Sequence, residues 1–434
     1  MRVLFTVMPS IPHLYPYIPL AWALQGAGHE VCFASYPGLA GPITNAGLNA
    51  VLVGEEKDLG TAVQECAVDP RIDAIVGPLA GDPQERDLWQ LIRLYLMSPF
   101  WMAYADDRPG QRQVTDDLVA FAETWRPDLV LWDPMFFPAP LAARASGAAH
   151  ARVLWGPDYF AWTRSRFLTE YGRPGSGVTT DRMAELMCPE LERLGQSFDE
   201  ELLVGQSSID TMPAELRLPV DHQYLPVRWV PYTGTDIFPG WLHGVPDKPR
   251  ACLTLGTSRR QFFDRNRTLP MLDLLEMVAD LDVELVATLN ADQLASVDRV
   301  PPNVRLVDYV PLNQLLPTCS AIIHHGGGGT FAAALAHGVP QLVVARRAGI
   351  SADYAQFVTR HGAGLVGPDI DSAFDADEVK SGLVRILGDP SFQAGAAALR
   401  ADLESLPSPN QLVPALEEIA SARCPQGRPA TTVR

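Results

Sequence analysis

Residues 319–345 read CSAIIHHGGGGTFAAALAHGVPQLVVA, an apolar run, four successive glycines and a second apolar run. The first run predicts a buried strand, and the segment from Thr330 predicts a helix whose end is marked by Gly338 and Pro340. Glycine is poor material for the interior of either element, because it costs backbone entropy and offers no side chain to pack. The glycines therefore lie at a strand-to-helix turn, at the carboxyl end of a parallel strand.

Such a turn is suited to binding an anion. The first N–H groups of a helix have no partner within the helix, and they carry a partial positive charge. Glycines let a phosphate approach this backbone closely, and Thr330 adds a hydroxyl donor. The run is neither GxGxxG nor GxxxxGK[ST], and it contains no Lys, which excludes an ATPase P-loop. We interpret it as a diphosphate cradle; the alternative is a tight turn required by packing alone.

The regions around this turn repeat one alternation of strand and helix signals. In the first part of the chain, 2–8 (RVLFTVM), 30–35 (EVCFAS) and 49–54 (NAVLVG) are strand signals with helical segments between them. From Arg250 the alternation starts again and continues through the glycine turn. Strand–helix–strand order implies parallel, doubly wound sheets. The fold class is therefore α/β, with two Rossmann-like doubly wound parallel-sheet domains facing a cleft.

Shifts in composition give the domain limits. We assign 1–212 to an acceptor-binding domain, 213–249 to an inter-domain linker rich in Pro and Gly, and 250–400 to a donor-binding domain. Residues 401–434 form a C-terminal helix and tail. Within the first domain, the aromatic segment between about Glu55 and Arg112 is an elaboration of the core.

Charge and composition exclude several classes of protein. The chain has 434 residues, 47% of them hydrophobic, and a net charge of −17, which argues against nucleic acid or an anionic membrane as the main partner. No apolar run is long enough to span a bilayer. The start, MRVLFTVMPS, is interpreted as a first strand and not as a signal peptide. The six cysteines form no CxxC pair, which fits a cytoplasmic protein with reduced thiols.

Five landmarks together carry a family resemblance. They are MRVLFTVMPSIPHLYPYIPLAWALQGAGHEV, RWVPYTG, TLGTS, VDYVPLNQLLPTCSAIIHHGG and HHGGGGTFAAALAHGVPQLVV. In this order and spacing the chain resembles the nucleotide-sugar glycosyltransferases of GT-B architecture (family 1). It is most similar to the actinobacterial enzymes that attach deoxysugars to macrolides and other polyketides. The resemblance implies inverting transfer of a deoxysugar from a TDP-sugar co-substrate, without a metal ion or another cofactor.

The family places its general base at the position of His13, in the loop after the first strand. An acceptor hydroxyl must lose its proton as it attacks the anomeric carbon, and a neutral imidazole within hydrogen-bond reach can take it. The diphosphate leaving group needs no acid if the cradle stabilises its charge. Without the motif context, a helix cap or a buried structural histidine is the simpler interpretation of His13.

A base of this kind needs a carboxylate that orients its other ring nitrogen. Asp133, at the end of the strand signal LVLW, is the first candidate, and Asp158 is the second. An Asp before Pro at a strand end is also a common turn residue. No HExxH motif or paired carboxylates at ligand spacing predict a metal site.

The remaining donor contacts follow from the resemblance. Residues after the first strand of the second domain and at the glycine turn bind the phosphates of the donor. Residues close to Leu315 bind its nucleotide base. The predicted donor nucleotide and phosphate contacts are Thr257, Ser258, Tyr309, Val310, His325, Gly327, Gly328, Gly329 and Thr330.

The chain departs from the family at the donor-sugar position. Most relatives have an acidic residue and then Gln, Thr or Asn about twenty residues past the glycines, where this chain has Ile350 and Ser351. An apolar side chain cannot accept a hydrogen bond from a sugar hydroxyl. This predicts a highly deoxygenated sugar. The alternatives are that Asp353 takes the role after a register shift, or that catalysis is impaired.

The acceptor is expected in the first domain, where aromatic residues cluster near strand ends. Phe136, Phe137, Trp155 and Tyr159 are the predicted acceptor contacts for a hydrophobic polyketide. Clustered aromatics are more often core, so this alternative stays open. Some relatives work only with a cytochrome-P450-like auxiliary protein. Such a protein and a homodimer are the macromolecular partners to test.

Two rival functions share the fold. A non-hydrolysing sugar-nucleotide epimerase needs acid and base carboxylates around the sugar ring, and the chain is poor in these near the glycine turn. A catalytically weakened nucleotide-sugar-binding protein would keep the cradle and lose turnover, and Ile350 keeps that alternative open. The leading hypothesis is the deoxysugar transferase.

Overall fold

The computed structural model describes most of the chain. The described residues are 1–56, 69–82, 85–104, 113–256, 271–289, 297, 299–345, 349–369 and 375–423. No helix in this described part is long and apolar enough to cross a lipid bilayer.

The chain forms two compact units, and each is interrupted in sequence. The N-terminal unit comprises Met1–Thr211, Arg217–Val227 and Pro407–Arg434, and the C-terminal unit comprises Met212–Leu216 and Arg228–Leu406. The range 213–249 therefore contributes residues to both units. It also contains strand β7 (Tyr224–Pro226) of the N-terminal sheet, although its composition suggests only a connection.

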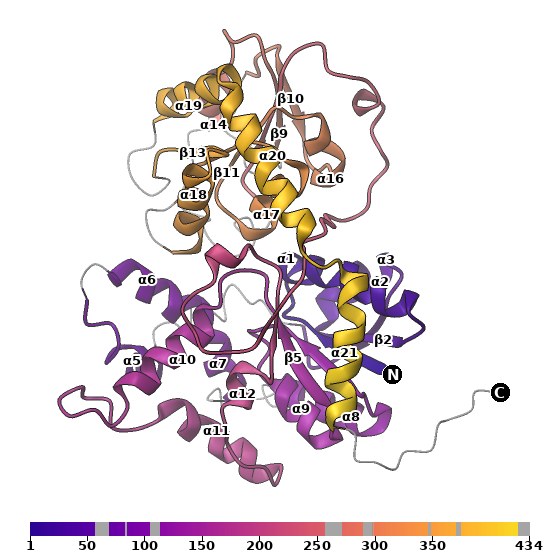
Figure 1. Cartoon of the computed structure of the whole chain (residues 1–434), viewed down its shortest axis with the longest axis vertical. Helices are drawn as coiled ribbons and strands as arrows, with labels where there is room; N and C mark the ends of the chain where they lie inside the picture. The colour runs from indigo at the N-terminus through magenta and orange to yellow at the C-terminus, as the bar shows by residue number, and fades with distance from the viewer. Residues whose placement is uncertain are drawn as a thin grey trace. The chain divides into compact units, whose positions relative to one another are not determined.

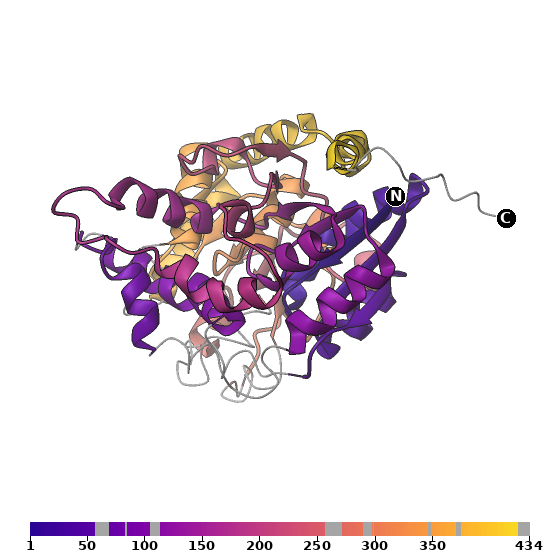
Figure 2. The same cartoon turned by 90° about the horizontal axis from the view of Figure 1, so that it is seen from below.

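The N-terminal unit is built on a parallel sheet of seven strands in the order β3-β2-β1-β4-β5-β6-β7. These are β1 (Arg2–Thr6), β2 (Glu30–Ser35), β3 (Asn49–Leu52), β4 (Leu129–Trp132), β5 (Ala149–Val153), β6 (Ser208–Asp210) and β7. Figure 2 shows the N terminus at the outer end of the indigo strands. The central strands β4 and β5 are fully buried. β4 (LVLW) is a continuous apolar run covered on both faces, whereas β5 (AHARV) also buries His150 and Arg152.

Helices cover this sheet and extend beyond it (Figure 1). They are α1 (Ile11–Leu14), η1 (Tyr15–Tyr17), α2 (Ile18–Gly26), η2 (Pro37–Leu39), α3 (Ala40–Asn45), α8 (Gln113–Trp125), α9 (Pro138–Ser146), α10 (Tyr159–Glu170), α11 (Arg182–Arg193) and α12 (Glu201–Val204). The aromatic elaboration holds α5 (Pro70–Val76), α6 (Arg86–Leu91), the π-helix η4 (Ile92–Met97) and α7 (Ser98–Tyr104).

The C-terminal unit has a parallel sheet of six strands in the order β10-β9-β8-β11-β12-β13. These are β8 (Arg250–Thr254), β9 (Glu284–Thr288), β10 (Val304–Val307), β11 (Ala321–His324), β12 (Gln341–Val343) and β13 (Gly364–Val366). Its helices are η5 (Ala214–Leu216), η6 (Gly240–Leu242), α14 (Met271–Glu276), α16 (Leu312–Leu315), η7 (Leu316–Thr318), α17 (Gly328–His337), α18 (Ile350–Arg360), α19 (Ala376–Gly388) and α20 (Pro390–Ser405). The predicted fold class, two doubly wound parallel-sheet α/β domains, is confirmed.

In each sheet the strand order reverses at one point. In the N-terminal unit β1 lies between β2 and β4, and in the C-terminal unit β8 lies between β9 and β11. Connections leave the two central strands there in opposite directions, so the carboxyl ends of these strands border a crevice where open α/β sheets bind ligands. His13 and Asp133 follow β1 and β4, while Gly256 and the glycine turn follow β8 and β11.

The last described helix, α21 (Pro409–Arg423), belongs to the N-terminal unit although it follows the whole C-terminal unit in sequence. It packs against α2 and β5 through Leu412, Val413 and Leu416, which are all buried. His29 Nε2 lies 3.0 Å from Glu417 Oε1 on this helix. In Figure 1, α21 runs in yellow along this unit.

Candidate active site

His13 lies on α1 and its side chain reaches Asp133, the residue directly after β4. The distance from His13 Nδ1 to Asp133 Oδ2 is 2.6 Å. The Asp133 side chain is completely buried, while the His13 side chain is 17% exposed. Since a carboxylate only accepts hydrogen bonds, Nδ1 carries a hydrogen, and in the neutral imidazole Nε2 then has the lone pair. The pair has the geometry of a base with its orienting carboxylate.

Other donors hold the Asp133 carboxylate in this orientation. Its Oδ1 accepts a hydrogen bond from the Met135 N–H at 2.9 Å. The Trp155 indole Nε1 lies 3.5 Å from the same oxygen. The backbone N–H of Asp133 donates to Thr6 O on β1, which ties the residue to the sheet. Asp133 is thus held from both strands that flank β4, by Thr6 on β1 and by Trp155, which follows β5.

Trp155 also contacts the imidazole of His13. The two ring centroids are 4.5 Å apart, with the planes tilted by 53°. Trp155 therefore touches both members of the His13–Asp133 pair. The sequence predicts Trp155 as an acceptor contact, and this role stays a prediction. Its packing on His13 was not foreseen, because only the fold brings the two residues together.

Asp158, the second candidate for the orienting carboxylate, has different partners. It forms an ion pair with Arg152, with 2.9 Å between Arg152 Nη1 and Asp158 Oδ1. Its Oδ1 also accepts the Ala161 N–H at 3.0 Å, which caps α10. Of the two carboxylates, the structure therefore brings Asp133 to His13.

The other predicted acceptor residues are buried in the N-terminal unit. Phe136 and Phe137 are at most 1% exposed, and Tyr159 is 7% exposed. The Phe137 ring packs edge-on against Phe100 with 5.2 Å between centroids. These contacts are those of a core, the alternative that the sequence left open. An acceptor role for these side chains remains a prediction.

The glycine turn lies where the sequence places it, between β11 and α17. His324 ends the strand and is fully buried. Its Nδ1 accepts the Gly326 N–H at 3.1 Å, and its Nε2–H donates to Gln341 Oε1 at 2.9 Å. Gly327 caps α17 without a side chain, so the first N–H groups of the helix are not occupied by a capping side chain. His324 therefore orients the turn from inside the unit.

The ring of His325, a predicted phosphate contact, packs against the backbone of Gly256 and of Gly327. A Cβ on Gly256 would lie 2.3 Å from His325 Cε1, and a Cβ on Gly327 would lie 2.7 Å from Nε2. Gly256 also has a φ of +71°, where a side chain is strained. These glycines are thus needed for the histidine ring as well as for backbone approach to a ligand.

The start of α18 lies against the same turn. A Cβ on Gly326, whose φ is +80°, would lie 2.5 Å from Ser351 Cβ. Ser351 is therefore in direct contact with the glycine turn. Ile350 is partly buried and packs against the apolar cluster that includes Phe331 and Tyr354. Asp353 lies in the first turn of α18.

The remaining predicted donor residues differ in what the structure shows. Tyr309 is 41% exposed, and its hydroxyl donates to Thr233 O. Val310 is buried beside Leu315. Thr330 is buried in the first turn of α17, which begins with Gly328 and Gly329. Thr257 and Ser258 lie outside the described residues.

No three His, Cys, Asp or Glu side chains in the described part of the chain group as a metal site. The absence of a metal or another cofactor from the reaction remains an expectation of the family resemblance.

Burial of His324 predicts a dependence of stability on pH. Desolvation lowers the pKa of His324 from 6.5 to about 4, although the hydrogen bond that the ring donates to Gln341 acts in the opposite direction. Above pH 6.5 both folded and unfolded states are neutral here. Between pH 6.5 and 4 only the unfolded state takes the proton, so this group lowers the free energy of unfolding by about 1.4 kcal/mol per pH unit.

Denaturant unfolding of the wild type and His324→Gln at pH 7.5, 6.0 and 5.0 measures this effect. We expect the variant to lose less stability on acidification than the wild type, whatever its stability at pH 7.5. Equal losses in the two proteins would contradict the prediction.

Comparison with known proteins identifies the family of the chain. Residues 22–256 match the N-terminal domain and 272–419 the C-terminal domain described as erythromycin biosynthesis protein CIII-like. The chain is 42% identical over 429 residues to aclacinomycin-T 2-deoxy-L-fucose transferase of Streptomyces galilaeus, covering 97% of this chain and 96% of that one. It is also 42% identical to 10-deoxymethynolide desosaminyltransferase of Streptomyces venezuelae, with 97% of each chain covered.

A solved structure of similar fold is that of the glycosyltransferase VinC in complex with dTDP. The TM-score is 0.81 and the identity 35%, over 97% of this chain and 100% of that one. This likeness confirms the GT-B architecture. The named relatives are sugar transferases, and none of these comparisons supports the epimerase alternative. The chain belongs to the erythromycin biosynthesis protein CIII-like family of glycosyltransferases.

Proposed function

We propose that this enzyme transfers a deoxysugar from a TDP-sugar to a polyketide or macrolide aglycone, with inversion at the anomeric carbon. The His13–Asp133 hydrogen bond of 2.6 Å at the reversal point of the N-terminal sheet carries the proposal. The relatives named above are transferases of 2-deoxy-L-fucose and desosamine, and a structure of similar fold was solved with dTDP. These names support the donor and acceptor classes proposed here.

In this reaction His13 acts as the general base. Its Nε2 takes the proton of the acceptor hydroxyl while that oxygen attacks the anomeric carbon. The bond from the anomeric carbon to the diphosphate oxygen breaks, and TDP leaves with its electron pair. Attack from the face opposite the leaving group inverts the centre. Asp133 keeps Nδ1 protonated and stabilises the imidazolium that forms.

The donor would be held by the C-terminal unit. The N–H groups at the start of α17, from Gly327 to Thr330, and His325 would bind the diphosphate, as would Thr257 and Ser258. Tyr309 and Val310 would hold the base. Because Ile350 offers no acceptor to a hydroxyl, the sugar beside it should be deoxygenated at that edge, with Ser351 and Asp353 contacting other polar groups.

The acceptor would contact the N-terminal unit through Trp155 and Tyr159, with Phe136 and Phe137 behind them. We further propose that the enzyme works in the cytoplasm without a metal ion. Two kinds of assembly, a homodimer and a complex with a P450-like auxiliary protein, extend this proposal. Size-exclusion chromatography of the enzyme, alone and co-expressed with such a protein, tests both.

Calorimetric titration with TDP and with UDP tests the donor class. TDP carries a base methyl group that UDP lacks, and it has no 2′-hydroxyl on its sugar. One methyl in an apolar pocket is worth about 1–3 kcal/mol. We therefore expect TDP to bind about 10- to 200-fold more tightly than UDP. A preference for UDP would overturn the TDP donor. Binding of neither nucleotide would overturn the proposed donor site as a whole.

A further inference from the structure

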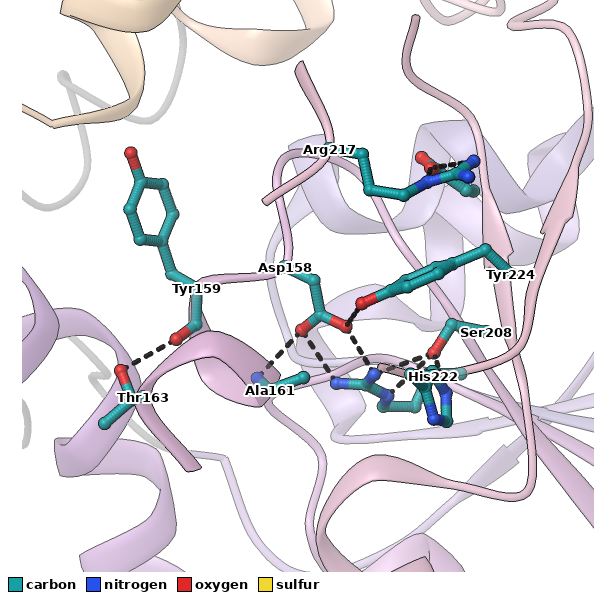
Figure 3. A network of polar contacts seen from close by, with 10 residues as sticks. Asp158, Tyr159, Ala161, Thr163, Ser208, Arg217, His222 and Tyr224 are labelled. Carbon is teal, nitrogen blue, oxygen red and sulfur yellow. Dashed lines mark hydrogen bonds and ion pairs between the residues drawn. The ribbon is translucent and has the colours of Figure 1, made fainter. Parts of the chain in front are cut away.

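A buried polar network connects the end of β5 with β6, β7 and the start of α10 (Figure 3). At its centre Arg152 is fully buried and forms a two-pronged ion pair with Asp158. Arg152 Nε and Nη2 also donate to Ser208 Oγ, at 3.1 and 2.7 Å. The network is outside the His13–Asp133 pair, and the transfer chemistry makes no direct use of it.

The hydrogens in this network can be assigned. Arg152 is a donor only, so Ser208 Oγ accepts from it and must give its own hydrogen to His222 Nε2, 3.0 Å away. His222 therefore accepts at Nε2. This agrees with its pKa, which burial and then the neighbouring Arg152 lower to about 4. Neutral His222 thus accepts the hydrogen of Ser208, the residue that binds the guanidinium.

Asp158 is satisfied on both oxygens. Oδ1 accepts from Arg152 and the Ala161 N–H, and Oδ2 accepts from Arg152 and the Tyr224 hydroxyl at 3.1 Å. The guanidinium of Arg217 lies over the Tyr224 ring, 4.8 Å from its centroid. Figure 3 shows Tyr224 and Ala161 approaching Asp158 from opposite sides. The four donors come from three elements, β5, α10 and β7, which together fix the position of the carboxylate.

The ion pair closes the segment 154–158, which carries Trp155. Leu154 begins this segment and is paired on both sides, by its N–H to Ile209 O and by its carbonyl to Thr211 Oγ1, each at 2.8 Å. Asp158 ends the segment. The Tyr17 hydroxyl, just after the helix of His13, donates to Val153 O at 2.8 Å. The segment is thus held at both ends, and Trp155 within it contacts the ring of His13.

We propose that Arg152 and Asp158 are positioning residues for the transfer reaction: their ion pair holds segment 154–158 so that Trp155 packs on His13 and keeps the imidazole turned toward Asp133. A buried ion pair adds little net stability compared with apolar residues of the same volume. Orientation is therefore the better explanation for it here. The inference rests on the proposed role of His13 as the base.

The N-terminal unit offers a matched control for Asp158. Asp181 also caps a helix, since its Oδ1 accepts the Ala184 N–H at 3.1 Å. It also pairs in two-pronged fashion with a buried arginine, Arg164, at 3.0 and 2.6 Å. Asp181 precedes α11, and within the described part of the chain its hydrogen bonds and ion pair go to Arg164 and Ala184 and not to the segment that carries Trp155. Asp158→Asn and Asp181→Asn therefore both remove a helix-capping carboxylate from a buried arginine, one at the segment and one away from it. The difference is that Arg164 keeps a second partner, Glu200.

The first measurement is the carbon–proton spectrum of the full chain labelled at histidine, with the His13 signals assigned by their loss in His13→Ala. The indole of Trp155 shifts these signals through its ring current. We expect Asp158→Asn and Trp155→Phe to move them, and Asp181→Asn to leave them in place. Unchanged His13 signals in a folded Asp158→Asn protein would overturn the proposal. This spectrum needs no turnover.

The second measurement is kcat and KM for the same variants. Misplacement of a catalytic group by about 1 Å costs on the order of 100-fold in rate. We expect Asp158→Asn to lower kcat by about this factor with the TDP affinity unchanged, and Asp181→Asn to retain kcat. Equal losses of kcat in both variants at equal Tm would mean a structural role only. Tyr224→Phe removes a single hydroxyl and should act in the same direction, so it serves if Asp158→Asn does not fold.

A double-mutant cycle shows whether Asp158 acts through Trp155. If it does, Asp158→Asn with Trp155→Phe lowers kcat no more than the larger single effect, whereas independent roles multiply. If the losses of kcat in the two single variants multiply in the double variant, Asp158 does not act through Trp155, and this part of the proposal is wrong. A wild type without transferase activity would refute the proposed function, and the His13 spectrum would still decide whether the ion pair positions the ring.

Discussion

His13→Ala is expected to lower kcat by about 10²- to 10⁴-fold, because the acceptor hydroxyl then loses its general base. The TDP affinity should stay at the wild-type value, since His13 lies in the N-terminal unit and the proposed donor residues lie in the C-terminal unit. Product formation at saturating donor and acceptor measures kcat, and calorimetry measures the affinity for TDP.

Two companion variants make this result specific. Asp133→Asn keeps the shape of the side chain but removes the carboxylate that holds Nδ1 protonated, so kcat should fall here as well. His243→Ala removes an exposed histidine of the C-terminal unit and should change neither parameter. The base assignment fails if His13→Ala retains the wild-type kcat.

Gly326→Ala is expected to weaken TDP binding by about 10-fold or more and to lower Tm. The residue has a φ of +80°, where a Cβ costs about 1–2 kcal/mol of strain. The new methyl would also lie 2.5 Å from Ser351 Cβ and 3.1 Å from Ser351 Cα. Either α18 or the turn must move. A shift of the turn displaces the N–H groups proposed to bind the diphosphate, and each 1.4 kcal/mol lost is a tenfold weaker complex.

Gly329→Ala is the matched control within the same glycine run. A Cβ there meets no atom within 4 Å, and the residue is not among the glycines with positive φ. Alanine is also the better helix former in α17. We expect Gly329→Ala to leave Tm unchanged or slightly higher, and to weaken TDP binding less than Gly326→Ala does. If the two variants bind TDP equally well, the geometry of Gly326 is not required for the cradle.

The central strands were predictable because burial on both faces leaves a clear pattern. The runs at β1, β4, β8 and β11 are apolar almost throughout, and all four lie at the strand-order reversals. The three strands that the sequence did not indicate are β6, β7 and β13. Each has only three residues, and they contain Ser, Asp, Pro and Gly. Such segments are strands only because a neighbouring strand pairs with them.

The candidate site also has one part that the sequence predicts and one part that only the fold shows. His13 and the glycine turn follow strongly patterned strands, so sequence position alone placed them at carboxyl ends. The contact of Trp155 with His13 joins residues far apart in the chain. Arg152 and Asp158 are only six residues apart, but their network is completed by Ser208 on β6, a strand that the sequence did not indicate. Arg152 is the one charged residue in ARVLW, and nothing in this stretch shows that its guanidinium pairs with a buried carboxylate.

The position of α21 has a consequence for how the enzyme matures on the ribosome. Domains generally fold as they emerge, the N-terminal one first. Here the helix that covers α2 and β5 is the last one described, so the unit that is synthesised first receives its final layer after the other unit has emerged. The unit that carries His13 and Asp133 is therefore completed last, and a nascent chain can hold a finished C-terminal unit before the N-terminal unit is complete.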